Sequence, residues 1–137
     1  MPTVADSPPP LRWSDLPGAP APGTPLLHRD AIGDGQVLLH TLAAANALPA
    51  SQPFSVLLLR SGTAVHAFVN RCAHFGVPLA ARQKQLLFQP HTSLSCNVHY
   101  ALYRWSDGLC VKGDCAGESL LPLPVVVDAD GCVCVGT

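Results

Sequence analysis

Two short clusters of metal-binding side chains constrain this 137-residue chain more than any other feature. Cys72 and His74 form a C-x-H pair, and Cys96 and His99 form a C-x-x-H pair, with 21 residues between His74 and Cys96. A zinc finger usually places its two cysteines together first and its two histidines together later. Here each segment offers one thiolate and one imidazole. That order suits a two-iron centre with unlike ends, although a single tetrahedral ion also tolerates it.

The residues around both clusters resemble the two cluster loops of Rieske ferredoxins and of the Rieske domains of oxygenases. The first loop that carries the resemblance is residues 70–79 (NRCAHFGVPL), and the second is residues 94–99 (LSCNVH). Tyr103 and Gly108 also stand where the family pattern has an aromatic residue and a glycine. The resemblance extends over about residues 26–135, which is most of the chain.

The resemblance implies an all-β protein of the Rieske-type fold. This fold is a small antiparallel β-barrel or sandwich with a cluster-binding subdomain, here about residues 70–105, that carries the two ligand loops. It also implies one Rieske-type [2Fe-2S] cluster per chain. The two cysteines would bind one iron as thiolates and the two histidines would bind the other as neutral imidazoles: Cys72, Cys96, His74 and His99. Because imidazole donates less negative charge than thiolate, such centres are easier to reduce than all-cysteine ones.

The loops also imply where the reduction potential falls. High-potential respiratory members of the family join the two loops by a disulfide and place a serine two residues after the second histidine. Leu79 and Val98 stand at the two disulfide positions, and Ala101 stands at the serine position. Tyr103 is then the remaining hydroxyl donor to the cluster sulfurs. The resemblance therefore implies a low-potential, ferredoxin-like centre, since hydrogen bonds to the sulfurs help to set the potential.

We expect the chain to be a one-electron carrier that accepts an electron from a reductase and passes it to an oxygenase or another oxidoreductase. The resemblance places the partner surface around His74, His99, Pro78 and Tyr100. Tyr100 follows His99 directly, where the family usually has glycine, so the exposure of His99 is open. Two alternatives remain: an accessory or regulatory Rieske-fold subunit of a reductase, and a zinc-binding structural module.

Several motifs of complete enzymes are missing from the sequence. It contains no phosphate-binding G-x-x-x-x-G-K-[ST], no dinucleotide-binding G-x-G-x-x-G, no H-E-x-x-H and no G-x-S-x-G. A Rieske oxygenase also needs a second domain with a 2-His-1-carboxylate iron site, and the printed chain ends at Thr137. We therefore expect an electron-transfer protein or an oxidoreductase component rather than a complete enzyme.

Composition and terminal sequence features argue against several other classes of protein. With 48% hydrophobic and 12% charged residues the chain is globular, and its net charge of −1 gives no reason to expect nucleic acid as a partner. No apolar stretch approaches the roughly 18 residues that span a membrane. The N-terminus lacks the features of a secretory signal, which predicts a cytoplasmic location. Six cysteines in such a chain suit metal binding better than a disulfide scaffold.

The chain divides into a proline-rich tail, residues 1–25, and a Rieske domain, residues 26–137. The tail holds eight of the fourteen prolines and cannot form regular ladders or helices. Trp13 and Leu16 could dock it onto the barrel. The domain alternates short β-type runs with turns, as an all-β barrel or sandwich does.

The expected strands are residues 54–60, 64–69, 86–88, 93–95, 103–105, 109–111, 125–127 and 132–135. The turn around Gly62 joins the first pair into a hairpin, and similar turns join the last two pairs. Residues 33–35 (GDG) predict a tight turn between the runs 26–28 and 36–40. Residues 42–48 could form a helical turn before Pro49 ends it.

The remaining cysteines are Cys110, Cys115, Cys132 and Cys134. Buried thiols are the favoured interpretation, because free cysteine is among the most buried residue types. A second metal or a disulfide stays open, since Cys132 and Cys134 alternate onto one face of a strand. The other histidines lack metal-ligand spacing and are expected to be ordinary surface or core residues: His28, His40, His66 and His91.

Overall fold

Three antiparallel sheets make up the protein in the computed structural model, which describes residues 12–16, 19–42, 54–71, 79–80, 82–95, 101–113 and 117–136. The first sheet has the order β1–β10–β9, with β1 (Pro25–His28), β10 (Cys132–Val135) and β9 (Val125–Val127). The second has the order β2–β3–β4, with β2 (Val37–Leu42), β3 (Phe54–Ser61) and β4 (Ala64–Val69). The predicted all-β class with antiparallel sheets is confirmed.

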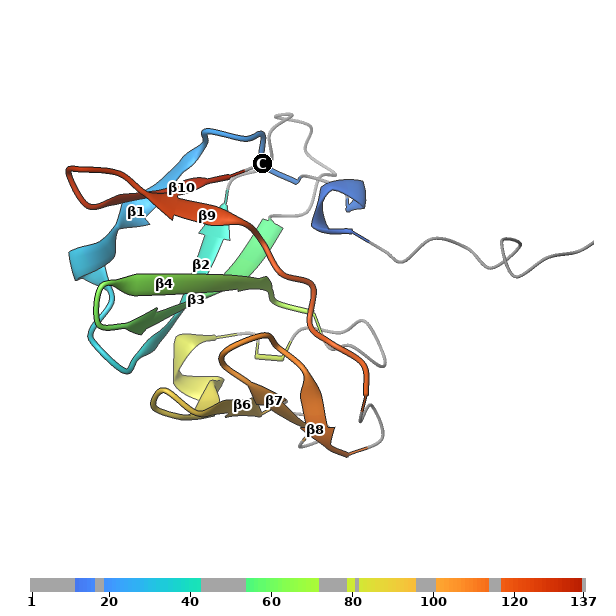
Figure 1. Cartoon of the computed structure of the whole chain (residues 1–137). Helices are drawn as coiled ribbons and strands as arrows, with labels where there is room; N and C mark the ends of the chain where they lie inside the picture. Colours follow the sequence, from blue (N-terminus) through green and yellow to red (C-terminus); the bar gives the residue numbers. More distant parts are fainter. Residues whose placement is uncertain are drawn as a thin grey trace, which may run out of the picture.

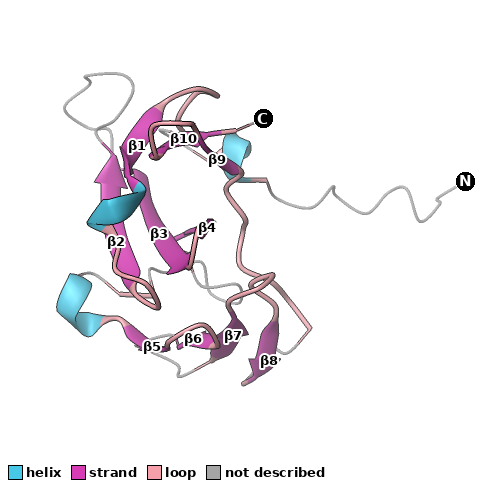
Figure 2. Cartoon of the chain, turned by 60° about the vertical axis from the view of Figure 1, so that its left-hand side comes forward, coloured by secondary structure: helices cyan, strands magenta, loops and turns pink. Residues whose placement is uncertain are grey.

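The third sheet has four strands in sequence order: β5 (Leu87–Gln89), β6 (Ser93–Ser95), β7 (Leu102–Arg104) and β8 (Cys110–Lys112). The β2–β3–β4 sheet lies between the other two (Figures 1 and 2). Three single-turn 3₁₀ helices, which the sequence did not predict, connect strands or precede them: η2 (Trp13–Asp15), η3 (Arg29–Ala31) and η4 (Gln83–Gln85).

Strand β3 separates two hydrophobic cores. Leu57 and Leu59 enter the core beneath the β5–β8 sheet, whereas Val56 and Leu58 enter the core of the β1–β10–β9 side. All four side chains are fully buried, because successive side chains of a strand point to opposite faces. This explains why residues 54–60 read as a nearly continuous apolar run instead of an alternating one.

The predicted hairpins are confirmed. β3 pairs with β4 up to Ser61 and Ala64, and the turn between them places Gly62 at a φ of 64°. β9 and β10 pair from Val125–Val135 to Val127–Val133. A two-residue turn with positive φ requires glycine, so turn chemistry and apolar runs suffice to find such local pairings.

The turn at residues 33–35 lies where the sequence predicts it, but the runs that it joins belong to different sheets. β1 pairs with β10, more than a hundred residues away in the chain, and β2 pairs with β3. The turn is closed by the Gln36 N–H, which donates to the Gly33 carbonyl at 3.0 Å, and the Gly35 N–H joins it to β3 by donating to the Arg60 carbonyl at 2.9 Å. The helical turn expected within residues 42–48 lies mostly outside the described residues.

Part of the proline-rich segment packs against the domain. Trp13 and Leu16 are partly buried against the β1–β10–β9 core, as predicted. The Gly23 N–H donates to the Val135 carbonyl at 2.7 Å, and the Val135 N–H donates to the Thr24 carbonyl at 2.9 Å. The boundary between residues 25 and 26 stays a prediction. Among the described residues, no helix is long and apolar enough to cross a membrane.

A comparison of two glycines tests how tightly the core beneath the β5–β8 sheet is packed. Gly108 has a φ of 73°, and a Cβ there would lie 2.7 Å from the Phe68 ring and 3.2 Å from Leu120 Cβ. Gly62 has a similar φ, but a Cβ there meets nothing within 4 Å. Gly62→Ala should therefore cost only the backbone strain, about 1 kcal/mol. Gly108→Ala should add an overpacking cost of about 1–3 kcal/mol.

Urea unfolding of both variants measures this difference. Equal losses of unfolding free energy would show that the Phe68 ring yields without cost, contrary to the expectation.

Candidate metal centre

The first predicted ligand segment follows β4 directly and is anchored by Asn70. The Asn70 side chain is buried, at 7% exposure. Its Oδ1 accepts the Leu79 N–H at 2.8 Å, and its Nδ2 donates to the Ala80 carbonyl at 2.8 Å and to Ser55 Oγ at 3.2 Å. One buried amide therefore binds the chain on the far side of residues 72–78 to the strand that precedes them. Buried polar groups need such partners. Here the bonds to Leu79 and Ala80 hold the two flanks of the segment together, and the bond to Ser55 joins them to β3.

The second predicted ligand segment connects β6 to β7. Leu94 pairs with Tyr103, and Ser95 pairs with Leu102, so the two ends of residues 96–100 are held at antiparallel strand spacing. Ala101 is buried against Gly113, where a Cβ would lie 3.1 Å from Ala101 Cα. Gly113 also has a φ of 108°, so only glycine permits this close approach.

One hydrophobic core holds the C-terminal flank of the first segment and both flanks of the second. Leu79 and Ala80 end the first segment, Leu94 precedes the second, and Ala101 and Tyr103 follow it; all five are buried in the same cluster. This core therefore supports three of the four segment ends, whereas Val69, which precedes the first segment, belongs to the other core. A site whose ligands are carried on loops depends on such support from well-packed elements.

The four predicted ligands lie outside the described residues: Cys72, His74, Cys96 and His99. The same holds for Pro78 and Tyr100, which were assigned to the partner surface. Their assignment therefore stays a prediction. Two thiolates and two imidazoles on segments supported by one core are nevertheless a donor set that fits a two-iron cluster with mixed ligands.

Gln83 is a positioning residue that sequence reasoning missed. Its Nε2 donates to the Val37 carbonyl and its Oε1 accepts the Leu39 N–H, both at 2.7 Å. The amide thus satisfies two backbone groups on the outer edge of β2. It also joins η4, which lies between the two ligand segments in the chain, to the β2–β3–β4 sheet. No motif signals such a role, because it depends on which strand edge the folded chain leaves open.

His91 makes a second connection between the β2–β3–β4 sheet and the β5–β8 sheet. Its Nδ1 is hydrogen-bonded to Ser61 Oγ in the β3–β4 turn, and its ring lies 5.6 Å from that of Trp105. Trp105 is itself buried and donates its Nε1–H to the Ser93 carbonyl at 2.8 Å. The packing role agrees with the prediction that His91 is an ordinary histidine.

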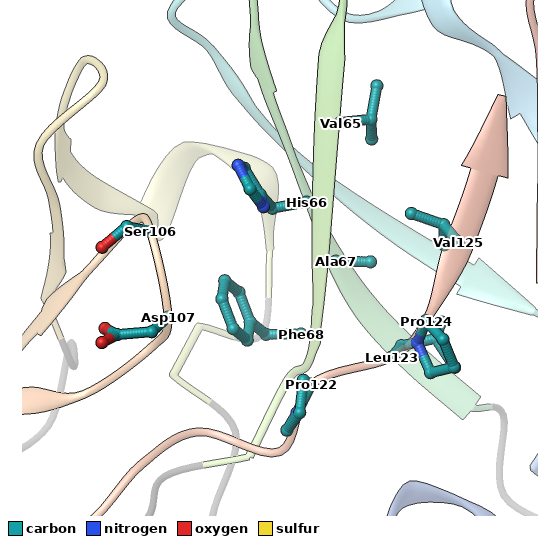
Figure 3. Close-up of a pocket in the computed structure, with 10 residues that line it drawn as sticks. All are labelled: Val65, His66, Ala67, Phe68, Ser106, Asp107, Pro122, Leu123, Pro124 and Val125. Carbon is teal, nitrogen blue, oxygen red and sulfur yellow. The ribbon is translucent and has the colours of Figure 1, made fainter. Parts of the chain in front are cut away.

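An open pocket of about 390 Å³ lies between β4, the turn after β7 and residues 122–125. Figure 3 shows His66 and Phe68 on the side of β4 that faces Ser106 and Asp107. Val65 and Ala67 lie on the opposite side of the strand, toward residues 123–125. Among the described residues, the side chains that line this pocket include no converging set of metal ligands.

The other cysteines divide into two kinds. Cys110 is 1% exposed, as predicted for a buried thiol. For Cys132 and Cys134 the prediction of burial is wrong: both are partly exposed, because Val133 and Val135 occupy the core face of β10. A hydrogen bond with Cys134, together with partial burial and nearby negative charge, raises the pKa of Cys132. Cys115 lies outside the described residues.

The Rieske [2Fe-2S] domain family matches residues 29–126 of this sequence. The chain belongs to that family. The cofactor that the family implies, a Rieske-type [2Fe-2S] cluster, is the one that the sequence predicted. A search of the curated proteins found no match.

Solved structures share the Rieske fold. The ferredoxin of carbazole 1,9a-dioxygenase from Nocardioides aromaticivorans IC177 has a TM-score of 0.62 and 18% identity, over 85% of this chain and 98% of that one. The terminal oxygenase of carbazole 1,9a-dioxygenase from Novosphingobium sp. KA1 has a TM-score of 0.65 and 24% identity, over 85% of this chain and 30% of that one. This Rieske protein thus spans less than a third of the oxygenase chain. At these identities the likeness shows the fold alone.

The Asn70 contacts give a stability prediction. Asn70→Ala leaves the buried Leu79 N–H and Ala80 carbonyl without their partner, so the unfolding free energy should fall by about 2–4 kcal/mol. Ser55→Ala removes only the longer bond to Asn70 Nδ2 and should cost less than about 1 kcal/mol. Urea denaturation followed by circular dichroism measures both. An Asn70→Ala loss no larger than the Ser55→Ala loss would contradict the anchoring role.

A pH prediction concerns the turn that lines the pocket. The Arg104 guanidinium, hydrogen-bonded to Asp107, and the Leu109 N–H lower the pKa of the Asp107 carboxyl. A lowered pKa contributes stability that is present above the unfolded-state value, near pH 4, and is lost as the pH falls through the folded-state value. Arg104→Gln should raise the pKa of Asp107 and make stability below about pH 4 depend less on pH.

Carboxyl NMR titration of Asp107 measures this shift. Lys112→Gln removes the same charge from the neighbouring strand and is the matched control. Equal shifts in the two variants would contradict a specific Arg104 contact.

Proposed function

We propose that this chain binds one [2Fe-2S] cluster and carries single electrons between partner proteins of an oxygenase or another oxidoreductase system. Cys72 and Cys96 bind one iron as thiolates, and His74 and His99 bind the other as neutral imidazoles. The observation that carries the proposal is that one core holds the end of the first donor segment and both flanks of the second, within a chain that matches the Rieske family over residues 29–126.

When bound, the cluster supplies one-electron redox chemistry. The described residues support a low reduction potential. Leu79 and Ala101, which stand where high-potential members have a disulfide cysteine and a serine, are buried aliphatic side chains. Neither side chain can donate a hydrogen bond to a sulfur, and fewer such bonds mean a lower potential.

A ferredoxin-like carrier is the form of this function that we favour. The chain shares its fold with a Rieske ferredoxin over 98% of that protein's length. Similar structures also include the reduced complex between oxygenase and ferredoxin in carbazole 1,9a-dioxygenase. We infer that a reductase and a terminal oxygenase or reductase dock near His74 and His99, through small and transient interfaces.

The two alternative functions, a zinc-binding structural module and an accessory or regulatory subunit of a reductase, receive less support. The family match argues against a zinc-binding structural module, because the cofactor of the family is an iron–sulfur cluster. An accessory subunit of a reductase would not require four intact donors, and all four are present in the sequence. The cytoplasmic location stays a prediction from the sequence.

Ligand substitutions under anaerobic conditions test the proposal. The purified protein should contain two irons per chain and give the visible absorption and, after dithionite, the EPR signal of a mixed-ligand cluster. Cys72→Ser and Cys96→Ser should each lose most of the iron, because each removes a thiolate from the same metal. Cys132→Ser, which changes a thiol of the β1–β10–β9 sheet, should keep it. Circular dichroism checks that each variant is folded.

A colourless wild-type protein with zinc in place of iron would refute the electron-carrier function. Loss of iron in Cys132→Ser equal to that in Cys72→Ser would refute the assignment of the ligands.

A further inference from the structure

Two thiols stand side by side on the outer face of β10. Val133 and Val135 are buried in the core, so the alternation of the strand turns Cys132 and Cys134 outward. Their Sγ atoms are 3.6 Å apart, and both side chains are partly exposed. The cluster ligands assigned above do not include either residue, so this dithiol has no part in the proposed electron transfer.

A carboxylate completes a group of three potential ligands. A carboxylate oxygen of Asp128 and the two Sγ atoms all lie within 4.8 Å of one another. Asp128 Oδ1 accepts the N–H groups of Asp130 at 2.9 Å and Cys132 at 3.0 Å, which fixes the carboxylate at the base of the β9–β10 hairpin. Metal-bound carboxylates are commonly oriented by hydrogen bonds of this kind.

The separation of the sulfurs suits a tetrahedral metal better than a disulfide. With Zn–S bonds of about 2.3 Å and tetrahedral angles, two thiolates on one zinc are about 3.8 Å apart. A disulfide requires about 2.05 Å. The observed 3.6 Å is close to the zinc value, so little movement of the strand is needed for both sulfurs to bind one ion.

The turn that carries Asp128 is braced by His28. The Asp30 N–H donates to His28 Nδ1 at 3.0 Å, so the ring proton lies on Nε2, which is hydrogen-bonded to the Asp130 carbonyl at 2.7 Å. The ring also lies against Gly131, where a Cβ would be 2.6 Å from Nε2. His28 therefore holds the turn in place, and both its nitrogens are already occupied by other bonds.

We propose that Cys132, Cys134 and Asp128 form a second metal site, separate from the Rieske centre, that binds Zn²⁺ with water as the fourth ligand. The two thiols bind as thiolates, so occupancy of the site releases their protons. One carboxylate oxygen beside two thiolates suits a borderline metal such as zinc, whereas copper(I) prefers sulfur ligands alone. Asp130, the next acidic residue of the turn, adds negative charge without belonging to the group of three.

Zinc binding by the reduced, full-length protein tests this site. Iron and zinc are counted per chain after anaerobic equilibration with zinc chloride, and zinc affinity is measured by competition with a chromophoric chelator. Wild type should bind one zinc that leaves the iron content unchanged. Cys132→Ser and Cys134→Ser should each weaken this binding by about 100-fold or more, and Asp128→Asn by about tenfold.

Asp130→Asn is the matched control, because it removes an equal charge from the same turn but no proposed ligand; it should stay within about threefold of wild type. Zinc uptake that is the same in wild type and Cys134→Ser would overturn the site. Equal weakening by Asp128→Asn and Asp130→Asn would also overturn it, because the effect would then be one of charge alone. Iron content and circular dichroism establish that every variant is folded, and failure of the Rieske assignment would leave these comparisons intact.

Discussion

The buried amide of Asn70 is the contact on which the placement of the first ligand segment depends. A segment of seven residues, 72–78, must leave a strand and return to the same core, and loops alone do not fix such a path. The Asn70 side chain uses its donor and acceptor groups to join β3, the end of β4 and residues 79–80. Since a buried amide without partners is costly, the folded state favours the arrangement that satisfies all of these groups at once.

The register of strand β3 is a second constraint, because it affects both hydrophobic cores. Its two faces belong to two cores. A change in the register of β3 would therefore disturb both the core of the β1–β10–β9 side and the core beneath the β5–β8 sheet. Gln83 adds a side-chain bridge to the edge of the same sheet. The cluster-side sheet is therefore held to the central sheet by packing on one face and by amide hydrogen bonds at its border. Such rigid support is what a redox site needs, because its ligands should move little when its charge changes.

Local patterns predicted much of this structure, and long-range contacts account for what they missed. The hairpins at residues 54–69 and 125–135 follow from apolar runs around turn residues, and the donor pattern together with its flanking residues led to the Rieske family. The pairing of β1 with β10 was not predicted, because nothing near residues 25–28 specifies a partner at the far end of the chain. Asn70 was recognised only as part of a motif; its function as an anchor depends on which backbone groups the fold brings to it.

For Cys132 and Cys134 the sequence pattern predicts only part of the observed arrangement. Alternation predicts that they share a face of the strand, but it cannot say which face. Here the choice is made by Val133 and Val135, whose burial is worth roughly 1.5–3 kcal/mol for each side chain. Turning the strand over would exchange two valines for two smaller thiols in the core and leave cavities beside Leu58. Burial of the two valines thus places the two thiols on the partly exposed face of the strand. A carboxylate that the hairpin turn holds in place lies next to them.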